Sequence, residues 1–243
     1  MDVVDRLVAG LHAAGGLVLP ARCGGCAAPG QVWCHDCRGA ARRPPPSTTP
    51  AVGTPACWAA TRCEGPVRAA VTAHKDGGRR DLRAGLADLL AVAAARALAG
   101  DPGLRAAVRR GVPVLLVPVP ESRRAGRRRG EDPVGALAAA AAAALDDESA
   151  VLVRALRHVR PVADQTGLGR AARAANLAGA LAVAPRFADR VEGAACLVLD
   201  DVVTAGATRA EAAGARRAAG SVQVAAAVVA ATPRSPRGPP GAS

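Results

Sequence analysis

One segment near the C-terminal end constrains the fold more than any other part of the chain. Residues 196–199 form an apolar run, Asp200 and Asp201 follow, and small residues then lead into a helix-forming stretch at 209–219. Such an apolar run is typical of a central parallel strand, and ligands bind where such strands end. Small residues let backbone N–H groups surround a phosphate. The N-terminus of a helix also favours a bound phosphate. The segment predicts a site for a phosphorylated sugar; the simpler interpretation is a strand and turn with a capped helix.

The rest of the chain alternates between strand and helix patterns. This alternation favours parallel pairing through right-handed crossovers, so we expect an α/β fold with helices flanking a parallel sheet. A short amphipathic helix is also expected at 3–11. The expected strands are 112–119, 150–153, 195–199 and 222–230, and the expected helices are 79–98, 133–145, 168–177 and 209–219.

Pro-rich stretches divide the chain of 243 residues. A Pro/Thr-rich segment at 42–55 reads as a linker, and a Pro/Gly/Ser-rich tail at 232–243 is predicted to be disordered. We therefore predict an N-terminal unit at 1–55, a main domain at 56–231 and a tail.

The charge composition is strongly basic and permits contact with phosphates or nucleic acid. The net charge is +12, nearly all the basic residues are arginine, and Lys75 is the single lysine. No apolar run approaches the length of about 20 residues that spans a bilayer, so no membrane insertion is expected. Acidic residues near the start are unlike a secretory signal, and we expect a cytoplasmic protein with reduced or metal-bound cysteines.

Four cysteines form two CxxC pairs, with seven residues between the pairs: Cys23 with Cys26, and Cys34 with Cys37. Two such turns present four thiolates to one ion, and zinc is the metal that this ligand set favours in a reducing compartment. Two redox dithiols or an iron–sulfur cluster are the alternatives, although the βαβ context of thioredoxin-type motifs is missing here. The pattern predicts a small zinc-ribbon-like head with a structural metal.

The acidic pair and the loop after it resemble the 5-phosphoribosyl 1-pyrophosphate (PRPP) motif of type I phosphoribosyltransferases. In that family the acids bind the ribose hydroxyl groups and a T-x-G-x-T loop holds the 5-phosphate. The resemblance implies that Asp200 and Asp201 bind the ribose and that a Mg²⁺ ion accompanies PRPP. It adds the following residues to the PRPP site: Val203, Thr204, Ala205, Gly206, Ala207 and Thr208.

An arginine-rich stretch follows the strand that ends at Pro120. Arginines there can hold a pyrophosphate by bidentate hydrogen bonds, whereas the simpler interpretation is a solvated basic loop. The order of the four-cysteine head, Lys75-Asp76-Gly77, Val117-Pro118-Val119-Pro120, Arg129-Gly130 and the PRPP motif is similar to the ComF family. The resemblance implies a type I phosphoribosyltransferase fold and a hood at 157–176. Its pyrophosphate and hood residues are Pro120, Arg123, Arg124, Arg127, Arg129, Lys75, Gln165 and Arg173.

ComF proteins are phosphoribosyltransferase-like and are linked in some bacteria to competence for DNA uptake. We therefore expect a PRPP-binding protein that transfers, or only binds, a phosphoribosyl group. The alternative is a non-catalytic protein for DNA handling, with single-stranded DNA or the uptake machinery as partner. Two departures affect the expected substrate contacts. Glu131-Asp132-Pro133 replaces the common F-N-Q, and Cys63 lies where ComF proteins have a tyrosine.

Overall fold

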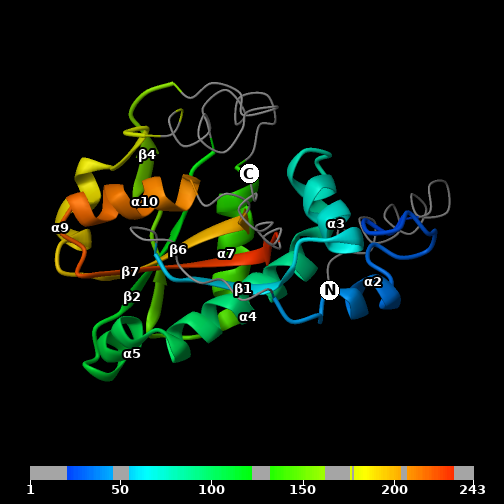
Figure 1. Cartoon of the computed structure of the whole chain (residues 1–243), viewed down its shortest axis with the longest axis horizontal. Helices are drawn as coiled ribbons and strands as arrows, with labels where there is room; N and C mark the ends of the chain where they lie inside the picture. Colours follow the sequence, from blue (N-terminus) through cyan, green and yellow to red (C-terminus); the bar gives the residue numbers. More distant parts are fainter. Residues whose placement is uncertain are drawn as a thin grey trace, which may run out of the picture.

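The computed structural model describes residues 21–45, 55–121, 132–161, 176, 178–203 and 207–232. At its centre is a parallel sheet of five strands in the order β1-β7-β6-β2-β3 (Figure 1). The predicted α/β class with a parallel sheet is therefore confirmed. The strands are β1 (Cys57–Arg62), β2 (Val114–Pro118), β3 (Ala150–Leu152), β6 (Ala195–Val203) and β7 (Gln223–Ala231). A separate antiparallel pair consists of β4 (Leu156–His158) and β5 (Leu181–Val183).

Helices cover both faces of the sheet. On one face, α4 (Arg83–Gly100) and α7 (Pro133–Leu145) bury Leu116, Leu197 and Leu199 of the strands. On the other face, α10 (Ala207–Ala218) covers Cys196 and Val198. Successive strand residues point to opposite faces, which explains this division along β6. The other helices of the described ranges are α2 (His35–Ala40), α3 (Gly65–Lys75), η1 (Arg80–Leu82), α5 (Pro102–Arg109), η2 (Pro185–Phe187) and α9 (Ala188–Val191).

The strand order reverses between β2 and β6. From β2 the chain crosses through α7 to β3 on one side, whereas from β6 it crosses through α10 to β7 on the other. Right-handed crossovers in opposite directions place α7 and α10 on opposite faces, as Figure 1 shows. The carboxyl ends of β2 and β6 therefore flank a topological switch point, where open α/β sheets bind ligands.

Small side chains allow this core to pack closely. The buried part of β7 is built from alanine and valine, and α4 presents a row of alanines to it. Gly85 of α4 lies under the indole of Trp33, where an added Cβ would be 2.7 Å from a ring carbon. Alanines and glycines leave room for this close approach, which compensates for a chain with few aromatic residues.

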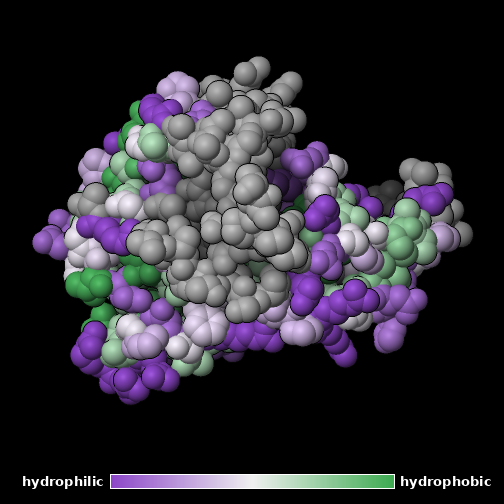
Figure 2. Space-filling view, viewed as in Figure 1, coloured by the Kyte–Doolittle hydropathy of each residue, from purple (hydrophilic) through white to green (hydrophobic). Residues whose placement is uncertain are grey.

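The described surface is mostly hydrophilic. Figure 2 shows hydrophilic side chains around α5, where Arg105, Arg109 and Arg110 are exposed. The inner side of this helix buries Leu104 and Ala107. Within the described part of the chain, no helix has both the length and the hydrophobicity needed to cross a membrane.

Candidate functional site

The acidic pair lies in the last part of β6, at the switch point. The pairing of β6 with β2 ends at Pro118 and Leu199, whereas the pairing of β6 with β7 continues to Val203. Pro118 and Pro120 lack an N–H group, so β2 cannot extend beside the acids. Asp200 and Asp201 therefore occupy a carboxyl end of the sheet where one neighbouring strand has stopped.

Both carboxylates are buried, at 7% and 5% exposure for Asp200 and Asp201. Asp200 Oδ1 accepts a hydrogen bond from the Asp201 N–H at 2.9 Å, and Asp201 Oδ1 accepts one from the Val202 N–H at 2.8 Å. By strand alternation, Asp201 shares the sheet face of Leu199, and Asp200 the opposite face. The two carboxylates therefore lie on opposite faces of the sheet in the last part of β6.

Lys75 contributes a positive charge to this site from the last residue of α3. Its Nζ lies 2.6 Å from Asp201 Oδ2. Burial alone would raise the pKa of Asp201, but the Lys75 charge and hydrogen bond outweigh it and lower that pKa. Burial and then the neighbouring Asp201 charge raise the pKa of Asp200 to about 7. One acid of the pair is thus held ionised, and the other titrates near neutral pH.

The neighbouring strands place further polar groups at this edge. Cys63 follows β1, and its backbone carbonyl accepts hydrogen bonds from the Arg68 guanidinium of α3 at 3.1 and 3.3 Å. Burial raises the pKa of the Cys63 thiol, and the charge of Asp201 acts in the same direction. Cys63 is therefore located near the acidic pair.

The antiparallel β4–β5 pair is attached to the end of β2. His158 of β4 forms a hydrogen bond between its Nε2 and the Pro120 carbonyl at 3.2 Å. Pro120, predicted as a pyrophosphate residue, thus lies at the switch point beside β4. The sequence analysis missed His158, because a single histidine in a polar stretch has no motif around it.

Several predicted site residues cannot be placed. Val203 ends β6, and Ala207 and Thr208 begin α10. The following predicted residues lie outside the described part of the chain: Thr204, Ala205, Gly206, Arg123, Arg124, Arg127, Arg129, Gln165 and Arg173. Their roles stay predictions.

The four predicted metal ligands converge in the N-terminal head. The sulfur atoms of Cys23, Cys26, Cys34 and Cys37 all lie within 4.8 Å of one another, and those of Cys26 and Cys34 are 3.7 Å apart. Tetrahedral zinc with Zn–S bonds of about 2.3 Å requires sulfur atoms about 3.8 Å apart. The cluster therefore fits the ligand geometry of a metal such as zinc.

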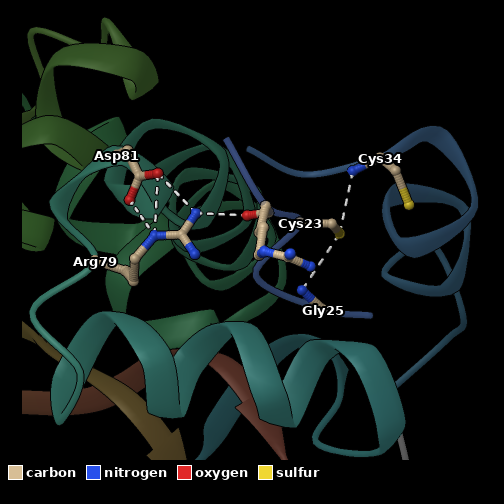
Figure 3. A network of polar contacts seen from close by, with 6 residues as sticks. Cys23, Gly25, Cys34, Arg79 and Asp81 are labelled. Atoms are coloured by element: carbon tan, nitrogen blue, oxygen red, sulfur yellow. Dashed lines mark hydrogen bonds and ion pairs between the residues drawn. The ribbon is translucent and has the colours of Figure 1, made fainter. Parts of the chain in front are cut away.

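Local hydrogen bonds favour ionisation of one of these thiols, that of Cys23. Backbone N–H groups of Gly25 and Cys34 each donate to the Cys23 sulfur at 3.4 Å (Figure 3). Burial opposes ionisation of Cys23, but these donors and the Cys26 N–H lower the pKa of its thiol to about 6. Burial raises the pKa of the Cys37 thiol, next to the other sulfur atoms. A bound cation would favour deprotonation of all four thiols.

The head packs directly against α3 and η1. Trp33 and Cys37 share a hydrophobic cluster with Val67 and Leu82. Glycine is required at the contact, because a Cβ at Gly25 would lie 2.9 Å from Pro66 at the start of α3.

A polar link joins the same two parts of the chain. Arg79 Nη2 donates to the Arg22 carbonyl at 2.7 Å and also pairs with Asp81 at 2.7 Å (Figure 3). Arg79 precedes η1, and Arg22 immediately precedes Cys23. The cysteine cluster is therefore connected to the segment that follows Lys75.

Comparisons with known proteins provide no family assignment. No family model matches the chain, and no curated protein matches it in sequence.

Proposed function

We propose that this chain binds PRPP at the carboxyl end of β6, as a type I phosphoribosyltransferase-like protein of the ComF type. One observation carries the proposal. A buried acidic pair, partly neutralised by Lys75, lies at the switch point of a parallel sheet, in the last part of the strand that precedes α10. Buried carboxylates need hydrogen-bond donors or positive charge, and a ribose diol supplies two donors.

The chemistry of the pair suits such a ligand. Asp200 and Asp201 would accept hydrogen bonds from the ribose hydroxyl groups, and the start of α10 would favour the 5-phosphate. Residues 203–208 are the phosphate loop that the resemblance implies. Lys75 already forms an ion pair with Asp201, so the two acids offer little negative charge to a divalent cation. A Mg²⁺ ion would be held mainly by PRPP oxygens and water, and would offset the charge of the pyrophosphate.

Transfer of the phosphoribosyl group would displace pyrophosphate from the anomeric carbon. A nucleophile must attack that carbon, and water must be kept away from it. The antiparallel β4–β5 pair, whose His158 contacts the Pro120 carbonyl, would form the base of the hood next to the proposed pyrophosphate loop, which follows Pro120 in the chain. The acceptor and the general base are left unassigned, so the proposal covers binding, with transfer as its extension.

The four-cysteine head would hold a structural zinc ion. Its ligand set is complete with four thiols, which leaves no open position for a catalytic water. The metal would stabilise a short segment that has one six-residue helix and little core of its own.

Isothermal titration of the full-length chain with PRPP and Mg²⁺ tests the binding site. The wild type is expected to bind. Asp200→Asn and Asp201→Asn are each expected to weaken binding at least about tenfold, because an amide cannot replace a charged acceptor for a diol. Asp88→Asn, on the exposed side of α4, is the matched control and should bind like the wild type. Equal affinity in all four proteins would remove the acidic pair from the site.

A screen for pyrophosphate release across candidate bases then tests transfer. Release that depends on one base and on Asp200 and Asp201 would establish an enzyme. If PRPP binds tightly but no base promotes release, the protein is a binding module.

A further inference from the structure

Lys75 lies closer to the acidic pair than its place in the sequence suggested. The resemblance groups it with pyrophosphate residues, but its Nζ is 2.6 Å from Asp201 Oδ2. The Asp201 side chain is 6% exposed and the Lys75 side chain 38% exposed, so the pair joins a buried acid to a partly accessible cation. The contact bridges α3 and β6, which are far apart in the chain.

Two adjacent buried carboxylates cannot both ionise cheaply without such a cation. Each negative charge raises the cost of the other, and burial adds to it. Among the described residues, the titratable groups around the pair are Lys75 from α3, with Asp76 beside it, and the Cys63 thiol after β1. Of these, Lys75 alone lowers the pKa of both Asp200 and Asp201. The negative charge available to a diol therefore depends on this one side chain.

The structure also explains how Lys75 is kept in place. It ends α3, whose start packs on Gly25 of the head through Pro66. Beyond Lys75, Leu82 lies under Gly24, and Arg79 is bonded to the Arg22 carbonyl. Both ends of this segment are thus fixed to the cysteine head, which limits the movement of Lys75 away from β6.

We propose that Lys75 is a positioning residue that holds Asp201 ionised, favours the ionised form of Asp200 and orients both acids for a ribose diol. This inference rests on the proposed PRPP site and deepens it, because it assigns Lys75 to the ribose half of the ligand. A lysine that contacts the pyrophosphate would affect PRPP alone. A lysine that acts through Asp201 affects every ligand that carries the ribose 5-phosphate part.

The test compares PRPP with ribose 5-phosphate, which has no pyrophosphate, by titration calorimetry on the wild type, Lys75→Met and Lys75→Arg. Loss of the charge raises the pKa of both acids, and a rise of one unit from the Asp200 value of about 7 reduces the ionised fraction about fivefold at pH 7. Lys75→Met is therefore expected to weaken the binding of both ligands about fivefold at neutral pH. The deficit should shrink at higher pH, where the pair ionises without help. Lys75→Arg should restore most of the affinity, and exposed Arg105→Ala is the charge-matched control.

A second readout needs no ligand. Lys75 is the only lysine, so reductive ¹³C-methylation gives one side-chain amine signal besides that of the N-terminus. The charges of Asp201 and Asp200 raise the pKa of Lys75 against the opposing effect of burial. The titration midpoint of its signal is therefore expected to fall in Asp201→Asn.

The outcomes separate the two proposals. If the wild type binds neither ligand, the proposed function fails. If it binds both but Lys75→Met loses only PRPP, Lys75 contacts pyrophosphate and the inference is wrong. The inference is also wrong if the loss of affinity in Lys75→Met does not vary with pH. The same holds if the titration midpoint of the Lys75 amine is unchanged in Asp201→Asn.

Discussion

Replacing Asp200 by asparagine is expected to stabilise the protein, and increasingly so as the pH rises. Folding raises the pKa of Asp200 from its ordinary value of 3.8 to about 7, because the carboxyl group is buried next to the Asp201 charge. The folded state therefore holds a proton that the unfolded state has already released, so stability falls as the pH rises between these two values. At about 1.4 kcal/mol per unit, the full penalty above the folded pKa is about 4 kcal/mol.

Asparagine keeps the shape and the hydrogen-bond acceptor but carries no charge, so Asp200→Asn avoids this penalty. Its advantage over the wild type in free energy of unfolding should grow by about 2–3 kcal/mol between pH 5 and pH 8. Urea denaturation of both proteins at a series of pH values measures this difference. Comparing two proteins at each pH cancels effects of the cysteine cluster that they share. The exposed Asp88→Asn should show no such growth.

If the difference in free energy of unfolding between the two proteins stays constant from pH 5 to pH 8, the reasoning is wrong. A constant difference would mean that Asp200 is ionised in the folded state without cost, and hence that the site is open to water or more strongly neutralised than Lys75 alone allows. The same result would weaken the case for a diol site, because a solvated carboxylate has less need of a ligand's donors.

The remaining predictions concern the head and its contact with α4. A strong zinc chelator should release about one zinc ion per chain and unfold the head, seen by metal analysis together with the near-ultraviolet signal of Trp33; metal analysis that finds no zinc would refute the structural site. Gly85→Ala should destabilise the protein by about 1–3 kcal/mol, because the new Cβ would lie 2.7 Å from a ring carbon of Trp33. Gly214→Ala, in α10 with no atom within 4 Å of a new Cβ, should instead stabilise it by about 0.5–1 kcal/mol in thermal or urea denaturation. Equal effects of the two substitutions would mean that the head does not pack on α4 in solution.

Local patterns predicted most of the elements that carry strong periodicity or clear boundaries. The Ala-rich helix at 133–145 is α7, with Asp132 capping it and Pro133 at its start. The expected strands at 112–119 and 222–230 correspond to β2 and β7 with small shifts at their ends, whereas β6 continues beyond the expected 195–199 to Val203 and includes both acids. The helix expected at 79–98 begins later, as α4, after the short turn η1.

Elements without such signals were missed. β1 has two alanines and an arginine in six residues, so its strand character comes from pairing with β7 rather than from propensity. α3, α5 and the β4–β5 pair are similarly short or weakly patterned. The expected helices at 3–11 and 168–177 fall wholly or largely outside the described residues.

For the site, the sequence by itself determined which residues are chemically suited to it. Two neighbouring acids after an apolar run, and four cysteines in two pairs, are local patterns whose chemistry depends on spacing along the chain. Only the tertiary structure decided which distant groups meet. It placed Lys75 on Asp201, joined the cysteine head to α3, and put the end of β6 at the reversal of strand order. The physical reason is that ion pairs and strand pairing join residues that are far apart in the chain, and local spacing does not encode such contacts.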